Sequence, residues 1–333
     1  MKKYIFLIFT IFFLVSCSPM PTEMPVTLTP VNVCYSALSG TQAVTWYAYE
    51  KGLFEKYGLL VNLVSMSGGS GAVSSLVSGD MDICQVASPS VVNAVAANQD
   101  IVMIAGLINT VPGSLMTQPE ITSPEMLQGR IIGIDLGGSA EALTRLALMD
   151  LGIDPDRDVV LLNIGSEPER IAALKARQID ATFINPPLTA SMRKKGFVEL
   201  FNVGAAKIPY QGTSIATTRK FLKENRSLVA NFMKAILEAI VRIKSDPEGS
   251  KAVMSQYLSL DPVADADALQ ESYNTIFMDT LGDIPYPTME GLQVVIDLAA
   301  KENPGAALIK PEEVVDTSIL EDLEKSGFIS GLK

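Results

Sequence analysis

The sequence predicts an α/β protein made of two doubly wound lobes that are joined by two chain crossings, with the carboxyl-terminal helices packed on lobe 1. An internal repeat and a regular alternation of strand-like and helix-like runs carry this prediction. With 333 residues, the chain is longer than one ordinary hydrophobic core requires. Its composition, 48% apolar and 19% charged, supplies enough apolar side chains for two cores.

The repeat becomes visible when the sequence is compared with itself at an offset of 98 residues. An apolar run, a glycine turn, a helix and a second apolar run then align without a gap. We interpret this pattern as two similar lobes in one polypeptide. The aligned pairs are Val33 with Ile131, Leu53 with Leu151, Leu63 with Leu161, Leu76 with Leu174, Asp82 with Asp180 and Pro89 with Pro187.

Strand-like runs alternate with helical runs in both copies, which predicts parallel sheets covered by helices on both faces. Beyond Thr217 the chain becomes helical. The expected strands are residues 31–35, 60–64, 83–87 and 101–107 in the first copy, and 131–135, 159–164 and 181–184 in the second. The expected late helices are residues 228–243, 249–257, 264–277, 289–302 and 318–326.

Two glycine-bearing segments mark the ends of the copies. Gly113-Ser114 closes the first copy and Gly212-Thr213 closes the second, now at an offset of 99 residues. We therefore expect the crossings at residues 110–114 and 210–214. This divides the chain into lobe 1, residues 31–111 with 214–333, and lobe 2, residues 112–213.

The first seventeen residues have the pattern of an export signal. Lys2 and Lys3 precede an apolar stretch from Tyr4 to Val15 that is too short for an ordinary membrane span. The stretch ends Leu-Val-Ser-Cys17, which resembles the bacterial lipoprotein signal; the alternative is a plain secretory signal with a chance cysteine. The sequence thus predicts a signal at 1–17, a lipid attached to Cys17, and an extracytoplasmic protein anchored to a bacterial membrane.

Residues 18–30 contain four prolines and have no helical or strand period, so we expect a tether there. The other two cysteines, Cys34 and Cys84, lie in predicted strands of the first lobe. We expect them to be buried free thiols, because a disulfide across neighbouring strands is geometrically awkward.

The composition excludes several kinds of chemistry. The chain has no histidine, the commonest general base and metal ligand, and no Cys-x-x-Cys pair. The glycine-rich segment at residues 67–71 lacks the lysine of a phosphate-binding loop. A net charge of −11 without a basic stripe argues against nucleic acid. We expect no enzyme activity, no cofactor and no metal site.

Small and hydroxyl-bearing residues follow the predicted strands, where open α/β sheets bind ligands. Such loops expose backbone N–H groups at helix N-termini. Trp46 is placed among the candidates as a stacking wall, although core packing is the alternative. The candidate ligand-binding residues are Ser39, Gly40, Thr41, Gln42, Trp46, Ser67, Gly68, Ser88, Ser90, Gly138, Ser139, Asn185, Tyr210, Gly212 and Thr213.

None of these predicted cleft loops carries lysine or arginine. We therefore expect the ligand to be a neutral or aromatic organic molecule, held by hydroxyls, backbone N–H groups and aromatic contact instead of a salt bridge. An oxyanion is the alternative, because helix N-termini can bind one without a cation. Arg170 and Lys207 are the first basic residues that would overturn this expectation by pointing into the cleft.

Four segments resemble one protein family: residues 48–59 (AYEKGLFEKYGL), 76–83 (LVSGDMDI), 127–133 (LQGRIIG) and 217–225 (TTRKFLKEN). They are similar to the substrate-binding lipoproteins of ABC importers for nitrate, sulfonates, taurine and thiamine-pyrimidine precursors. The resemblance implies a type II periplasmic-binding-protein fold, a sulfonate, pyrimidine-like or other small organic ligand, an ABC permease as partner and a monomeric state.

Two alternatives stay open. A pyrimidine-synthase-like enzyme has the same fold, but it needs histidine and clustered cysteines that this chain lacks. A tethered ligand sensor would share both the fold and the lipoprotein signal, so the neighbouring genes would have to separate it from an importer component.

Overall fold

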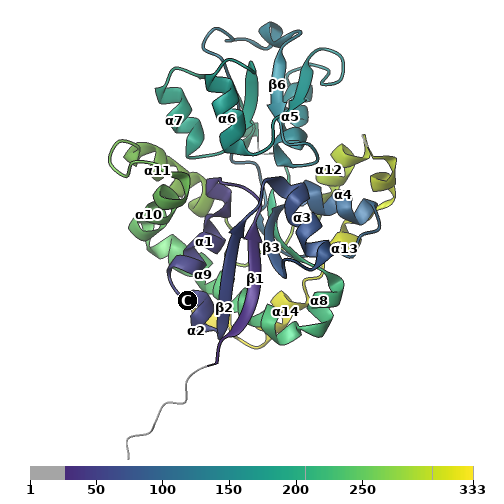
Figure 1. Cartoon of the computed structure of the whole chain (residues 1–333), viewed down its shortest axis with the longest axis vertical. Helices are drawn as coiled ribbons and strands as arrows, with labels where there is room; N and C mark the ends of the chain where they lie inside the picture. The colour runs from purple at the N-terminus through teal and green to yellow at the C-terminus, as the bar shows by residue number, and fades with distance from the viewer. Residues whose placement is uncertain (1–26, 207, 302, 333) are drawn as a thin grey trace, which may run out of the picture.

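A computed structural model describes residues 27–332 except 207 and 302. This part of the chain contains two five-stranded sheets, one in each of two lobes that lie one above the other, and each sheet is flanked by helices (Figure 1). We call the part built on the first sheet lobe 1 and the part built on the second sheet lobe 2. The two crossings between them run through the middle of the molecule.

The sheet of lobe 1 has the order β2-β1-β3-β10-β4. The first three of these strands are parallel, while β10 runs antiparallel to both of its neighbours. The strands are β1 (Thr29–Tyr35), β2 (Leu59–Ser65), β3 (Ile83–Ala87), β4 (Val102–Ile108) and β10 (Thr213–Thr217).

The sheet of lobe 2 has the order β7-β6-β8-β5-β9, which repeats the plan of lobe 1 strand for strand. Here β5 is the antiparallel member, between β8 and β9. This equivalence confirms the internal repeat. The strands are β5 (Ser114–Thr117), β6 (Ile131–Ile134), β7 (Val160–Asn163), β8 (Ala181–Ile184) and β9 (Val198–Asn202).

The expectation of purely parallel sheets is wrong, because each sheet receives one strand directly from a crossing. The chain leaves β4, crosses, and enters lobe 2 as β5; it later leaves β9 and returns as β10. Each arriving strand runs against its neighbours. The pairing of Thr213 with Ala87 and of Ser114 with Ile184 fixes its register.

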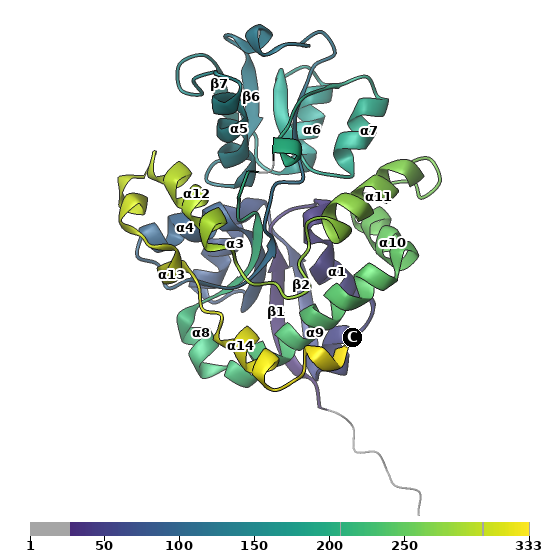
Figure 2. The same cartoon turned by 180° about the vertical axis from the view of Figure 1, so that it is seen from behind.

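Helices cover both faces of each sheet, and the late helices pack on lobe 1 as predicted (Figure 2). Lobe 2 has α5 (Ser139–Asp150), α6 (Glu167–Lys175) and α7 (Leu188–Lys194). The first half of lobe 1 has α1 (Ala43–Glu50), α2 (Leu53–Lys56), α3 (Gly68–Ser78) and α4 (Ser88–Ala96). The late helices are α8 (Arg219–Glu224), α9 (Arg226–Ser245), α10 (Pro247–Leu258), α11 (Ala266–Ser272), α12 (Met289–Ala300), α13 (Pro311–Val314) and α14 (Ser318–Lys325).

Short helical turns complete the description. The helix expected at residues 264–277 is α11 followed by a π-helical turn, η4 (Tyr273–Met278). The 3-10 turns are η1 (Gly40–Gln42), η2 (Pro124–Leu127), η3 (Gly204–Ala206), η5 (Pro304–Leu308) and η6 (Ser330–Leu332).

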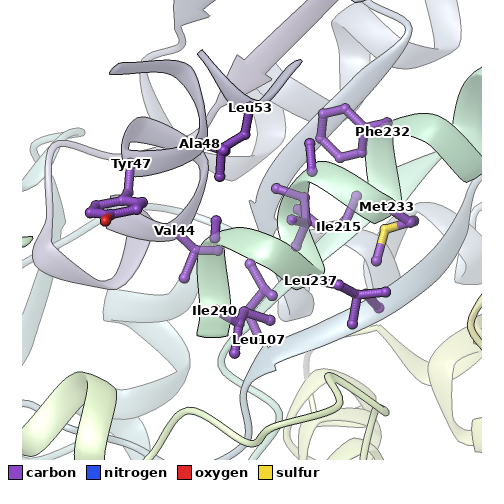
Figure 3. Close-up of a cluster of buried hydrophobic side chains, with 14 of the residues drawn as sticks. Val44, Tyr47, Ala48, Leu53, Leu107, Ile215, Phe232, Met233, Leu237 and Ile240 are labelled. Atoms are coloured by element: carbon purple, nitrogen blue, oxygen red, sulfur yellow. The ribbon is translucent and has the colours of Figure 1, made fainter. Parts of the chain in front are cut away.

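The largest core lies in lobe 1, where α9 packs against α1 and the sheet (Figure 3). The apolar face of α9 recurs at helical spacing, so it presents a continuous stripe to its neighbours. Phe232 stacks on Phe54 of α2 with ring centroids 5.1 Å apart. This packing makes lobe 1 a rigid support for the loops that follow β1 and β3.

Cys34 and Cys84 form a disulfide, so the expectation of free thiols is wrong. The two residues face each other in the parallel register of β1 and β3, with their Cα atoms 4.4 Å apart. That separation falls at the short end of the range that a disulfide can span.

Several predictions fall on the amino-terminal segment. The proposed signal, Cys17 and the tether up to residue 26 lie outside the described residues. The predicted boundary of the tether at residue 30 is wrong, because Thr29 and Pro30 belong to β1 and pair with Leu59 and Leu60. Over the described ranges, the structure contains no helix with the length and apolar character needed to span a membrane.

Candidate functional site

An enclosed cavity of about 60 Å³ lies where the two lobes meet the crossings. This volume corresponds to on the order of five water molecules. Its walls come from the loop after β1, from the last residue of β3, from the start of α3, from both crossings and, on the lobe 2 side, from the ends of β6 and β8 with α5 and α6. It therefore sits at the carboxyl ends of strands, where the α/β architecture places ligands.

Nine of the fifteen candidate residues line this cavity: Ser39, Thr41, Gln42, Gly68, Ser139, Asn185, Tyr210, Gly212 and Thr213. The other six do not: Gly40, Trp46, Ser67, Ser88, Ser90 and Gly138. The structure thus brings together most of the predicted loops, although they are up to 174 residues apart in the chain (Ser39 to Thr213).

Trp46 belongs to the core of lobe 1 and does not reach the cavity. Its ring stacks on Tyr257 with centroids 4.6 Å apart and meets the edge of Tyr35 at 5.4 Å. The core-packing alternative was therefore the right one. Ser67 is also misplaced as a candidate, since it is exposed ahead of α3.

Ser90, Gly40 and Gly138 stand at the rim, where the lobes touch. The Ser90 hydroxyl donates to the Gly137 carbonyl at 2.9 Å, and the neighbouring Ser70 hydroxyl donates to Leu136 at 3.3 Å. Gly40 lies so close to lobe 2 that a β-carbon there would be 2.6 Å from the Pro186 carbonyl oxygen. The lobes are therefore in contact around the cavity.

A second set of contacts links the lobes on the side of α7 and α11. The Arg193 guanidinium bonds both carboxylate oxygens of Glu271, at 2.7 and 2.8 Å. The Lys194 Nζ atom lies 3.5 Å from Oδ2 of Asp267 in α11. Each pair is partly exposed, so its contribution to lobe closure is small, about 0–1 kcal/mol.

Two polar atoms on the cavity wall have no hydrogen-bond partner within the part of the chain that the structure describes: Gln42 Oε1 and Thr213 Oγ1. The Tyr210 hydroxyl has no partner of regular hydrogen-bond geometry, but it interacts with the Ser139 hydroxyl, which opposes the rise of its pKa. Gln42 and Tyr210 are almost completely buried. A buried polar atom without a partner costs about 1–3 kcal/mol. Atoms left in this state around one cavity are available to a bound molecule.

The cavity also contains three charged residues that the candidate set missed: Asp135, Glu167 and Arg170. The expectation of a cleft without basic side chains is therefore wrong, and Arg170 is the residue that overturns it. Asp135 follows β6, while Glu167 and Arg170 share the cavity-facing side of α6. Lys207, the other residue considered, lies outside the described residues.

Local sequence holds α6 in place. Ser166 and Glu169 form a capping box at its start, with Pro168 in the first turn. The Glu167 carboxylate accepts from the backbone N–H and the side-chain amide of Asn185, at 2.8 and 2.9 Å. Asn185 is thus a cavity residue that also fixes Glu167.

Burial raises the pKa of the Glu167 carboxyl, against the opposing charge of Arg170. Asp135 is half-buried as a residue, but protein atoms surround its carboxyl group, and this burial raises its pKa in the same way. Burial, and then the nearby charge of Asp135, raise the pKa of the Tyr210 hydroxyl. The acidic groups of the cavity therefore hold their protons more tightly than exposed ones.

No group of three or more histidine, cysteine, aspartate or glutamate residues is arranged to hold a metal ion among the residues that are described.

Two α/β lobes, two crossings and an enclosed polar cavity between them define the architecture of the solute-binding proteins that close by hinge motion.

The family agrees with this architecture. Residues 41–250 match the family model described as NMT1/THI5 like, and the chain belongs to that family. It is 23% identical over 334 residues to a Brachyspira hyodysenteriae protein named as an ABC transporter periplasmic binding protein, covering 94% of this chain and 95% of the relative. A Brucella abortus protein named as a binding protein is 29% identical over 238 residues, 70% of this chain and 72% of that one.

Solved structures show the same fold. The alkanesulfonate-binding protein SsuA of Xanthomonas axonopodis pv. citri, bound to MOPS, superposes with a TM-score of 0.70. The match covers 87% of this chain and 97% of SsuA at 18% identity. The predicted type II periplasmic-binding-protein fold is therefore confirmed.

Proposed function

We propose that this protein is an extracytoplasmic solute-binding protein that captures a small organic ligand between its lobes and delivers it to the permease of an ABC importer. The observation that carries the proposal is the cavity at the lobe junction, whose wall holds unpartnered polar atoms on Gln42 and Thr213 beside the hydroxyls of Tyr210 and Ser139. The Brachyspira relative, named as an ABC transporter periplasmic binding protein, supports the importer role.

The disulfide supports an extracytoplasmic location, because disulfides persist in oxidising compartments and are rare in the cytosol. Cys34 and Cys84 are both fully buried, so their bond serves structure and is not positioned for surface redox chemistry. This agrees with the export signal that the first residues of the sequence predict.

The proposed binding site is tested first by identifying what the protein carries. Native mass spectrometry of protein purified from its own host should show a bound small molecule that denaturation releases. With that molecule as the titrant, Tyr210→Phe and Ser139→Ala should each weaken binding by about fivefold, since each removes one hydrogen-bonding hydroxyl of the cavity wall, worth about 1 kcal/mol.

The matched control is Tyr49→Phe, because Tyr49 is a half-exposed tyrosine on α1 outside the cavity. It should leave the affinity unchanged. Wild-type affinity in both Tyr210→Phe and Ser139→Ala would show that the ligand binds elsewhere.

We also propose that Cys17 carries the lipid that anchors the protein. The variant Cys17→Ala should move the protein from the membrane fraction to the soluble fraction, because the acyl chains supply the membrane affinity. Immunoblots of separated fractions measure this, with Ser18→Ala as the neighbouring control. A wild-type protein that is already soluble after export would contradict the anchor.

A further inference from the structure

The charges around the cavity do not balance. Asp135 and Glu167 contribute two carboxylates, and Arg170 contributes the only guanidinium among the described residues of its wall. Resting on the solute-binding function above, we propose that the cavity selects a small organic cation, such as a protonated amine, amidine or guanidine, whose N–H groups meet Asp135 and Glu167.

Arg170 does not neutralise the two carboxylates by direct contact. Its guanidinium donates to the Thr182 hydroxyl at 3.1 Å, to the Gly165 carbonyl at 2.6 Å and to the Phe183 carbonyl at 3.4 Å. These are uncharged oxygens that fix the side chain against the β8 side of the wall. Arg170 therefore acts on the carboxylates only through space, and the wall retains one more negative than positive group.

Asn185 donates two hydrogen bonds to Glu167, and the Glu141 backbone donates one to Asp135. Neither carboxylate, however, has an oppositely charged partner in contact among the described residues. A buried excess charge of this kind is costly because it is removed from water. Glu167 has only 3% of its surface exposed, so solvent offers it little compensation. A ligand that carries a positive charge supplies the missing partner. An anionic ligand would add a third negative group to the same space.

The opposite wall of the cavity, on the lobe 1 side, has hydrogen-bond acceptors that lack N–H donors. Gln42 Oε1, from lobe 1, is a buried acceptor without a partner, and Gln42 is only 1% exposed. The unpartnered hydroxyl of Thr213 can accept a hydrogen bond as well, and so can the Tyr210 hydroxyl, which interacts with the Ser139 hydroxyl. A flat cation with several N–H groups would satisfy acceptors of both lobes at once, which links binding to closure.

The pH dependence of binding distinguishes a cation from an anion. The titratable and charged groups that act on the two carboxyls are Arg170 on α6 and Tyr210 on the crossing; α5 contributes only backbone N–H groups, such as that of Glu141, and the cavity residues of lobe 1 are uncharged. Burial raises the pKa of both carboxyls above 3.8 for Asp135 and 4.5 for Glu167. A cation binds their ionised forms and expels protons, so its affinity rises with pH until both raised pKa values are passed. The affinity of an anion would fall over the same range.

Three probes of matched size and different charge test the proposal: methylguanidinium, N-methylurea and methanesulfonate. The measurement is the melting temperature of exhaustively dialysed full-length protein at equal probe concentration and equal ionic strength. Methylguanidinium should raise it more than the other two probes. In Glu167→Gln the affinity for methylguanidinium should fall at least tenfold, whereas Asp150→Asn, an exposed carboxylate on α5, should match wild type.

A larger shift with methanesulfonate, or no excess of methylguanidinium over N-methylurea, would overturn the cation proposal. The variant Tyr210→Phe separates this failure from failure of the site itself. If Tyr210→Phe abolishes the rise in melting temperature that methanesulfonate causes, the cavity binds a ligand of the opposite charge. If the melting-temperature changes caused by the probes are the same in wild type, Tyr210→Phe and Ser139→Ala, the probes bind elsewhere and the proposed binding site is wrong.

A measurement without any probe completes the test. A carboxyl whose pKa is higher in the folded than in the unfolded state lowers stability as pH rises from the unfolded value through the folded value. The contribution of Glu167 to stability should therefore fall as pH rises above about 4.5. Carboxyls with lowered pKa values act in the opposite direction but are shared by both proteins, so the stability of wild type relative to Glu167→Gln should fall over this range. Identical pH profiles for the two proteins would show that Glu167 carries no excess charge, and would overturn the proposal.

Discussion

Replacing Cys34 and Cys84 together with alanine should lower the free energy of unfolding by about 4 kcal/mol. The disulfide closes a loop with a sequence separation of 50 residues, and cross-links of this length restrict the unfolded chain by about that amount. The bond also ties β1 to β3; the loop after β1 and the last residue of β3, Ala87, both line the cavity. Urea unfolding followed by circular dichroism measures the change.

A reducing agent provides the control for the disulfide. It should destabilise the wild type by a similar amount and leave the alanine double variant unchanged, because that variant has no bond to reduce. A loss below about 1 kcal/mol in the variant would mean that cavity formation and loop restriction contribute little here.

Gly40→Ala should lower ligand affinity by about 10-fold to 100-fold while leaving the fold intact. The added β-carbon would lie 2.6 Å from the Pro186 carbonyl oxygen and 3.2 Å from Pro187 Cδ, both in lobe 2. The clash with the Pro186 backbone exists only when the lobes are together, so it raises the energy of the closed form by about 1–3 kcal/mol. The same β-carbon would lie 2.8 Å from Ile276 Cδ1 in lobe 1, so the end of that flexible side chain must shift in both the open and the closed form. Calorimetric titration with the molecule that the purified protein carries gives the affinity.

The control for Gly40→Ala is Gly71→Ala, since a β-carbon at Gly71 in α3 meets no other atom within 4 Å. Small-angle scattering adds a structural readout. With ligand present, wild type and Gly71→Ala should contract and Gly40→Ala should contract less. Equal contraction and equal affinity in all three proteins would contradict a closure that passes through Gly40.

Apolar runs and glycine turns were sufficient to predict the parallel strands and most helices, because each run is long enough to show its period. The antiparallel strands β5 and β10 escaped prediction. They are four and five residues long, completely buried, and without alternation. Their pairing depends on partners far along the chain, such as Ser114 with Ile184, which no local pattern encodes.

The candidate site was incomplete for a different reason. The loop pattern of hydroxyl and glycine residues predicts only loop positions, whereas Glu167 and Arg170 lie on a helix, α6. The repeat contained a usable signal: at the offset of 98 residues, Asp135 corresponds to Ala37 and Glu167 to Gly69, and all four line the cavity. Trp46 could not be assigned in this way, because its stacking partner Tyr257 lies in a part of the chain outside the repeat.

The position of β10 has a consequence for how the chain is made. This strand lies between β3 and β4, so the sheet of lobe 1 is split into two parts until residue 217 has been synthesised and exported. All strands of lobe 2, from Ser114 to Asn202, come before it. Lobe 2 can thus complete its sheet while lobe 1, whose first strand emerges earlier, still waits with open strand edges. A chain interrupted between the two crossings would expose β3 and β4 to pairing with other molecules.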